Sequence, residues 1–320
     1  MSITNPITQP HLVNTVLGPL SHLVFGITDA HNHVWIDPID GAAKGSPVLN
    51  DQEMITRELG EYIKAGGKTI LDCQPGGCGR DANMLMDLSI TSGVNIIACT
   101  GFHRRKYYPQ NHSYWKWSEQ KWTDYLISEL DDGVAESKQN QKLIRAGFIK
   151  IALESVWEET PQSALNGAVN AARETGAAVE IHTEKGILAE NIVEHFLDKG
   201  VNSSQIILCH MDKRMDIGIH SELAKAGVLL EYDTFFRTKY SPEENVWRLI
   251  DTMVNSGLSY RLALATDMAE TEYYHNLGGG PGLASLPGII QDRLIRMQVP
   301  ENNIQQMLGE NIARRLAGLN

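Results

Sequence analysis

Cysteine and long hydrophobic runs are both scarce in this sequence. Only four cysteines, Cys73, Cys78, Cys99 and Cys209, occur among the 320 residues, which is too few and too scattered for a disulfide scaffold. No window is long and apolar enough to span a bilayer. The first 20 residues also lack a basic segment followed by the apolar stretch of a signal peptide. We therefore expect a reduced, cytoplasmic protein.

Positive charge is also in short supply. Lys and Arg together number 28 against 39 Asp and Glu, so the formal net charge is −11 at pH 7. The resulting negative field repels nucleic acid and anionic lipid, and no basic run offsets it. The expected partner is a small-molecule substrate, with no nucleic acid and no membrane.

Short apolar runs typical of buried parallel strands recur along the chain, and segments with helical spacing separate them. Asp51 is the expected N-cap of one helix, Gly176 the C-cap of another, and Ser241 with Pro242 the start of a third. The alternation predicts one (β/α)8 barrel (TIM barrel) as a single domain over residues 1–320, with a doubly wound open sheet as the alternative. The expected strands are residues 24–31, 68–73, 94–101, 147–153, 177–183, 205–210, 227–233 and 261–267.

Histidines and one aspartate fall where the predicted strands end. The stretch "DAHNH" places His31 and His33 one residue apart, so both face the same side of a strand. His182, His210 and Asp267 end three further strands. In a barrel the carboxyl ends of all strands meet at one face. Because neutral imidazoles and carboxylates suit a divalent ion, we predict a metal centre there.

Lys150 lies inside the apolar strand "GFIKIAL". An unpaired ammonium there would cost several kcal/mol, roughly, on burial. Burial lowers the pKa of a lysine, and a neutral amine reacts with CO₂ to give an anionic carbamate that can bridge two divalent ions. The alternative is a core lysine paired with a carboxylate, Glu154 or Glu180.

The longest strand-free stretch between the early strands, residues 102–146, contains "HRRKYYPQNHSYWKWSEQKW", which is loaded with Tyr, Trp and His. We expect its first part, about residues 102–120, to form an aromatic insertion over the mouth of the barrel, with Tyr107 among the substrate-binding residues. The alternative is that the aromatic side chains pack together without touching a ligand.

Taken together, "DAHNH", "GFIKIA", "EIHTEKG", "ILCHMDK" and "LATDM" occur in an order that resembles the phosphotriesterase family of the amidohydrolase superfamily, over about residues 20–317. The resemblance implies a dinuclear metal hydrolase and, often, a homodimer. His31, His33 and Asp267 would hold the more buried ion, His182 and His210 the outer ion, and carbamylated Lys150 would bridge them with a hydroxide. Asp267 would also accept the proton of the attacking water. Zn²⁺ is expected, with Mn²⁺ or Co²⁺ as alternatives.

The loops after the last two strands, "EYDTFFRTKYSPEEN" and "DMAETEYYHNLGGGPGL", are similar to a branch of this family that hydrolyses lactones of phosphorylated sugars. The resemblance implies that Lys213, Arg237 and Lys239 bind the substrate. Glu270 and Glu272 stand where that branch carries basic residues, and two carboxylates would repel a phosphate.

We therefore predict a lactonase acting on a sugar or related lactone and leave its phosphorylation open. A phosphotriesterase or other phosphoesterase, or an N-acyl amide hydrolase, using the same metal centre is the alternative. A non-catalytic binding protein is a remote one.

Overall fold

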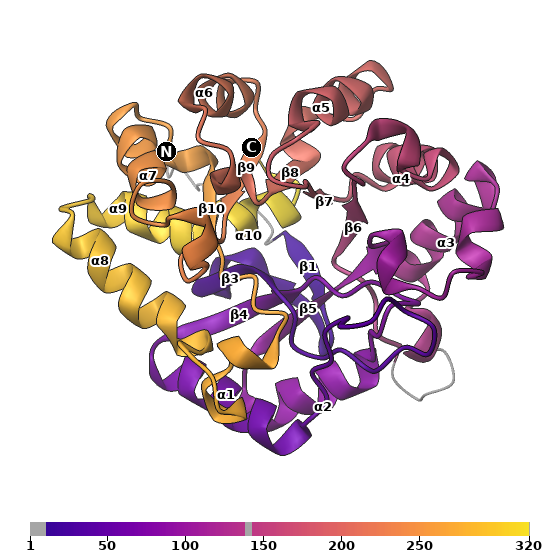
Figure 1. Cartoon of the computed structure of the whole chain (residues 1–320), viewed down its shortest axis with the longest axis horizontal. Helices are drawn as coiled ribbons and strands as arrows, with labels where there is room; N and C mark the ends of the chain where they lie inside the picture. Colours follow the sequence, from indigo (N-terminus) through magenta and orange to yellow (C-terminus); the bar gives the residue numbers. More distant parts are fainter. Residues whose placement is uncertain (1–10, 138–142, 320) are drawn as a thin grey trace, which may run out of the picture.

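In the computed structural model, which describes residues 11–137 and 143–319, eight parallel strands stand side by side in sequence order. Helices form a ring around them (Figure 1). The sheet is nearly closed, since the backbone N–H of Asp267, beyond the last strand, donates to the carbonyl of His31 in the first over 3.0 Å. The prediction of a (β/α)8 barrel is confirmed. The strands are β3 Ile27–Asn32, β4 Gly67–Asp72, β5 Asn95–Gly101, β6 Phe148–Ala152, β7 Val179–His182, β8 Ile206–Cys209, β9 Leu229–Tyr232 and β10 Leu262–Leu264.

Two of the three predicted helix boundaries agree with the structure. The Asp51 side chain accepts a hydrogen bond from Met54 N over 3.1 Å and begins α1, and Gly176, with a φ of 75°, ends α4. The predicted start at Ser241 is wrong, because Ser241 has a left-handed φ of 45° and the helix begins only at Val246.

The helices are α1 Gln52–Lys64, α2 Ala82–Ser92, α3 Glu119–Asp131, α4 Gln162–Thr175, α5 Ala189–Asp198, α6 Ile217–Lys225, α7 Val246–Asn255, α8 Gln291–Arg296, α9 Glu301–Gln305 and α10 Asn311–Leu316. Within the described part of the chain, none of them combines the length and the apolar character needed to cross a membrane.

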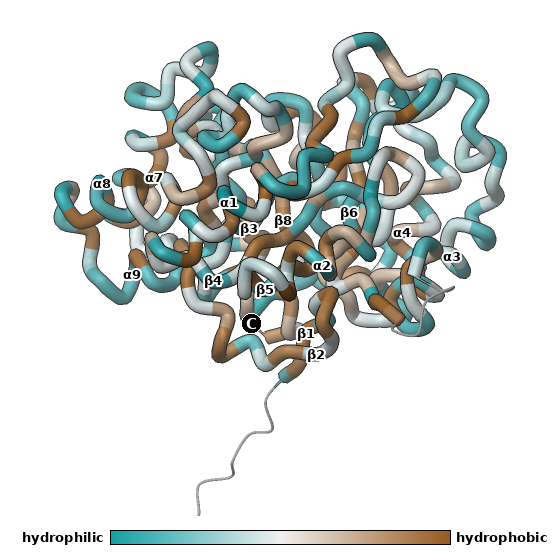
Figure 2. The backbone as a smooth tube through the Cα atoms, turned by 90° about the horizontal axis from the view of Figure 1, so that it is seen from below, coloured by the Kyte–Doolittle hydropathy of each residue, from teal (hydrophilic) through white to brown (hydrophobic). Residues whose placement is uncertain are grey.

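Apolar side chains fill the barrel where the strands begin. One buried cluster joins inward-facing residues of different strands, among them Ile97, Phe148 and Ile207, and a second packs the outer faces of the strands against the helices. Figure 2 shows the hydrophobic colour in the middle of the barrel, for example around β8, and the hydrophilic colour in many outer loops.

A hairpin of β1 Leu12–Thr15 and β2 Gly18–Ser21 covers this end, and its Val13 joins the inner cluster. A Cβ at Gly147 would lie 2.7 Å from Asn14 O, so glycine permits this close approach. The opposite end, where the strands finish, is left for a site.

Candidate metal centre

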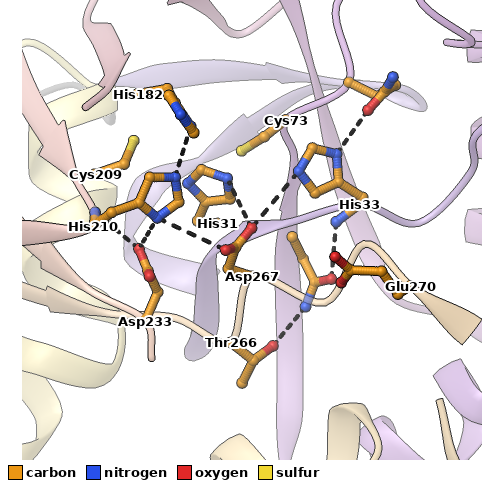
Figure 3. Close-up of polar contacts among 12 residues, drawn as sticks. His31, His33, Cys73, His182, Cys209, His210, Asp233, Thr266, Asp267 and Glu270 are labelled. Atoms are coloured by element: carbon orange, nitrogen blue, oxygen red, sulfur yellow. Dashed lines mark hydrogen bonds and ion pairs between the residues drawn. The ribbon is translucent and has the colours of Figure 1, made fainter. Parts of the chain in front are cut away.

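A cavity of about 220 Å³ lies where the barrel strands end, and all five predicted histidine and aspartate ligands line it. They come from four places in the sheet: His31 and His33 from β3 and the residue after it, His182 from the end of β7, His210 from just after β8, and Asp267 from beyond β10. Figure 3 shows His31, His33 and His210 arranged around the Asp267 carboxylate, with His182 beyond His210.

The ring nitrogens converge on shared points. His182 Nδ1 and His210 Nε2 lie 2.8 Å apart. His31 Nε2 lies 3.6 Å and His33 Nε2 3.9 Å from the same oxygen, Asp267 Oδ1. Burial lowers the pKa of His182 to about 4 and holds the pKa of His210 well below its ordinary value. Neutral imidazoles leave lone pairs free, so the rings of His182 and His210 fit a divalent cation.

A buried acceptor holds the other ring nitrogen of three of these histidines. Such partners fix the tautomer and orientation of imidazoles that bind metals. His33 Nδ1 lies 2.8 Å from Gln74 Oε1, and His210 Nδ1 lies 2.7 Å from Asp233 Oδ2. His31 Nδ1 lies 2.8 Å from Glu231 Oε1.

These three acceptors were not among the residues predicted from the sequence. Glu231 had the same signal as Lys150, an ionisable residue inside an apolar strand, whereas Gln74 and Asp233 stand just beyond strand ends, as the predicted ligands do.

Asp267 is held as a carboxylate by its surroundings. Burial alone would raise its pKa, but Arg237, whose Nη2 lies 3.2 Å from Asp267 Oδ2, and the nearby His31 lower it below the usual range. The Arg237 guanidinium also donates to the Asp267 carbonyl. Asp267 and His210 both have left-handed backbone, with φ of 47° and 62°. Backbone of this kind in non-glycine residues costs free energy and is concentrated at functional sites.

Lys150 lies below the cavity and is not among its lining residues. Its Nζ is 2.5 Å from Glu180 Oε1, 3.2 Å from Cys209 Sγ and 3.3 Å from His31 Nδ1. Burial alone would lower the pKa of Lys150, but its neighbours, Cys209 and Glu180 foremost, raise it well above its ordinary value. The structure thus shows the ion-paired alternative, with Glu180 as partner, and the carbamate stays a prediction.

Glu180 and Glu231 form a second acidic layer inside the barrel, and both are fully buried. Burial, followed by the charge of Glu180, raises the pKa of Glu231 to about 7. The described residues contain two groups whose metal-ligating atoms all lie within 4.8 Å of one another. One group is His31, His210 and Asp267, and the other is His31, Glu180, Cys209 and Glu231.

The four predicted substrate-binding residues, Tyr107, Lys213, Arg237 and Lys239, all line the cavity. They differ in whether a carboxylate of the protein already pairs with them. Arg237 is occupied by Asp267 and by Glu270, whose Oε2 lies 3.4 Å away.

Lys213 Nζ and Lys239 Nζ lie 5.3 Å and 5.1 Å from the ring centre of Tyr240. No carboxylate of residues 11–137 or 143–319 lies within ion-pair distance of either lysine. Glu272 is exposed and is not among the cavity-lining residues, so only one of the two expected acidic side chains reaches the mouth.

The aromatic stretch is divided between two roles. His103, Arg104, Lys106 and Tyr107 line the cavity. Residues further along pack away from it, since the Tyr114 ring lies 5.0 Å from that of Trp122 in α3. His103 is a cavity residue that the sequence analysis missed. Its ring centre is 5.3 Å from that of His182, and burial together with His182 holds its pKa well below the ordinary value.

Comparison with known proteins gives consistent results. The sequence model of the phosphotriesterase family matches residues 11–316. A phospho-furanose lactonase of Mycoplasmopsis synoviae is 28% identical over 288 residues, which cover 82% of this chain and 78% of that protein. An N-acetyltaurine hydrolase of Salmo salar is 27% identical over 350 residues, which cover 95% of this chain and 97% of that protein. The crystal structure of an amidohydrolase from Mycoplasma synoviae has a TM-score of 0.87 and 26% sequence identity, and the match covers 97% of this chain and 92% of that one.

Proposed function

This chain is a hydrolase of the phosphotriesterase family, and from that premise we propose that it opens small sugar-type lactones with the aid of two divalent metal ions. The observation that carries the proposal is the convergence of four imidazoles and one carboxylate on a single cavity at the ends of the strands. The relative named as a phospho-furanose lactonase supports the choice of a lactone.

The donor atoms suggest how two ions would be shared. His31, His33 and Asp267 would hold one ion, and His182 Nδ1 with His210 Nε2 would hold the other. Nitrogen and oxygen donors of this kind suit Zn²⁺, with Mn²⁺ or Co²⁺ as alternatives. When bound, the ions would lower the pKa of water and polarise the carbonyl of the substrate.

Lys150 is part of the proposal as a carbamate formed from CO₂. The carbamate requires the neutral amine, whereas Cys209 and Glu180 favour the ammonium. We propose that carbamylation accompanies metal binding, because positive charge beside His31 offsets the negative charge of Glu180. A carbamate carbon resonance that appears with carbon-13-labelled bicarbonate only in the presence of metal supports this step. Its absence from active, metal-loaded protein contradicts it.

Asp267 is the proposed proton carrier. Its low pKa keeps it ionised at neutral pH, so it can accept the proton of the attacking water and deliver it to the oxygen that leaves when the lactone ring opens. Arg237 holds the carboxylate in place from one side. The small volume of the cavity, about 220 Å³, favours a compact substrate.

We propose that the substrate carries an anionic group, and phosphate is the first choice. Lys213 and Lys239 flank Tyr240 in the cavity and offer two positive charges to such a group. Glu270, which argued against phosphate, is paired with Arg237. Part of the repulsion expected between its carboxylate and a phosphate is therefore cancelled.

An N-acyl amide is the second candidate. The relative named N-acetyltaurine hydrolase matches 95% of this chain. Taurine carries a sulfonate, which the same two lysines could hold. A phosphoesterase remains a third possibility for the same centre, and a non-catalytic binding protein ranks last because all the expected ligands are present.

A substrate panel tests the proposal. Protein loaded with Zn²⁺, Mn²⁺ or Co²⁺ in bicarbonate buffer is assayed on a phosphorylated furanose lactone, its unphosphorylated counterpart, N-acetyltaurine and an aryl phosphotriester. We expect the highest kcat/KM on the phosphorylated lactone and no turnover after chelation. A preference for N-acetyltaurine would establish the second candidate instead, and turnover that survives complete removal of metal would refute the metal-dependent function. The possible homodimer is tested separately by sedimentation.

A further inference from the structure

A second polar cavity, of about 410 Å³, lies at the end of the barrel opposite the metal centre. Its lining includes Arg261, which precedes β10, and Arg314 and Arg315 of α10, with Glu310 as the acidic residue among the lining residues that the structure describes. We call it the arginine cavity. It shares no lining residue with the cavity at the metal centre.

Arg315 is a buried cation with no carboxylate partner among the residues that the structure describes. Only 3% of the surface of this residue is exposed to solvent. The guanidinium donates to two neutral carbonyls, from Nη1 to Ser203 O over 3.0 Å and from Nη2 to Gly227 O over 2.9 Å. No carboxylate of the described residues lies within ion-pair distance of it. Because arginine does not lose its proton in proteins, this burial costs free energy that an anion would offset.

Arg261 adds a second positive charge to the same cavity. Its Nε is buried and has no hydrogen-bond partner among the described residues. Its guanidinium carbon lies 5.1 Å from the ring centre of Tyr260, which supplies an aromatic face but no full negative charge. Burial and the neighbouring charge of Arg261 lower the pKa of Arg315 to about 9. Two like charges are thus held near each other, an arrangement that an anion between them would relieve.

We propose that the arginine cavity binds a small oxyanion of the phosphate type, either free phosphate or the phosphate group of a metabolite. The guanidinium group presents several N–H donors in a planar fork that matches tetrahedral and planar oxyanions. The unpaired Nε of Arg261 and the charge of Arg315 supply donors and counter-charge from two different elements. Among the described lining residues Glu310 is the one carboxylate, against three arginines, so these residues carry net positive charge in a protein whose formal charge is −11.

The proposal does not depend on the reaction at the metal centre, although that centre can itself attract phosphate. The first test therefore locates the site directly: crystals of the metal-loaded protein are soaked in tungstate, which mimics phosphate and scatters anomalously. We expect an anomalous peak between Arg261 and Arg315. Peaks confined to the metal centre would overturn the proposal.

A titration then separates the two sites in solution and distinguishes the sources of the phosphate group. Inorganic phosphate, pyrophosphate and a sugar phosphate are titrated calorimetrically into wild-type protein, Arg261→Gln and the exposed control Arg296→Gln. We expect Arg261→Gln to weaken one binding event about tenfold or more, the usual effect of removing a hydrogen bond between charged groups. The control should not change it.

Binding also stabilises the folded state by mass action, so phosphate should raise the Tm of the wild type and of Arg296→Gln more than that of Arg261→Gln. An equal rise in all three proteins, with identical isotherms, would show that Arg315 only braces the starts of β8 and β9. We chose Arg261 for substitution because replacing Arg315 would also leave the carbonyls of Ser203 and Gly227 without donors.

Discussion

Replacing Arg237 by glutamine tests whether a neighbouring cation keeps Asp267 ionised. Arg237 Nη2 lies 3.2 Å from Asp267 Oδ2, and the two side chains are only 10% and 11% exposed. Unit charges at this separation attract each other by about 5 kcal/mol at an effective dielectric constant of about 20. Desolvation and the competing pair with Glu270, at 3.4 Å, reduce the net effect. An aspartate beside an arginine commonly has its pKa lowered by about one to three units, which sets the size of the expected change.

The assay is the pH dependence of kcat/KM for metal-loaded Arg237→Gln. The pKa of Asp267 is lowered in the wild type, so Asp267 stays ionised as the pH falls. Without Arg237 that pKa rises, and the acid limb of the profile should move upward by about one to three pH units. The free energy of unfolding of the metal-free protein should also depend on pH differently in the variant. A lowered carboxyl pKa stabilises the fold above the unfolded-state pKa and ceases to do so as the pH falls through the folded-state pKa. The variant should therefore lose stability near neutral pH, and the difference should vanish in acid.

Two matched variants complete the test. Arg237→Lys retains the charge and should restore most of the wild-type profile. Arg293→Gln breaks an ion pair with the exposed Glu243 on the surface and should leave the profile unchanged. An acid limb of Arg237→Gln that coincides with the wild type, together with a raised KM, would refute the reasoning and return Arg237 to the role of a substrate ligand.

Three further outcomes follow from the site. His182→Ala should lose one equivalent of bound metal and reduce kcat by more than the roughly 10–100-fold typical of residues that only support ligands, with an unchanged circular dichroism spectrum; near-normal turnover would count heavily against the metal centre. Lys213→Ala and Lys239→Ala should each raise KM about tenfold or more for an anionic substrate and leave KM for an uncharged lactone unchanged, since each removes a hydrogen bond to a charged group. Lys150→Ala should leave Glu180 buried without its ammonium partner and lower the free energy of unfolding by about 3–5 kcal/mol in urea titrations. Adding Glu180→Gln should recover part of that loss, and short carboxylic acids should partly restore the activity if they replace the carbamate. Equal stability of Lys150→Ala and wild type would contradict the ion pair.

The strand positions were predictable because they depend on local pattern. The barrel strands lie in short segments rich in Val, Ile, Leu or Ala, as Ile206–Cys209 does, and such segments are typical of strands buried on both faces. Helix boundaries were predictable where one side chain makes the boundary, as Asp51 does for α1. The start of α7 was not, because Ser241 adopts left-handed backbone in a loop that runs along the cavity.

The candidate ligands were predictable for a geometric reason: residues that end parallel strands meet at one rim. The acceptors that bind the other ring nitrogens of these histidines were harder to predict from the sequence. Gln74 and Asp233 also follow strand ends, but only the fold brings them to His33 and His210. His103 was overlooked because the aromatic residues around it were interpreted as one insertion, whereas the structure divides them between the cavity and α3.

The sequence by itself determined the barrel, the order of its strands and the set of side chains that end them, since each follows from the chemistry of short segments. Only the tertiary structure decided which charges meet. It paired Lys150 with Glu180 on the neighbouring strand, and it placed Arg237 against Asp267 and Glu270. It also set Lys213 and Lys239 beside Tyr240 and brought Arg261 and Arg315 together at the far end. Interactions between charges depend on distance and burial in space, and neither quantity is contained in the spacing of residues along the chain.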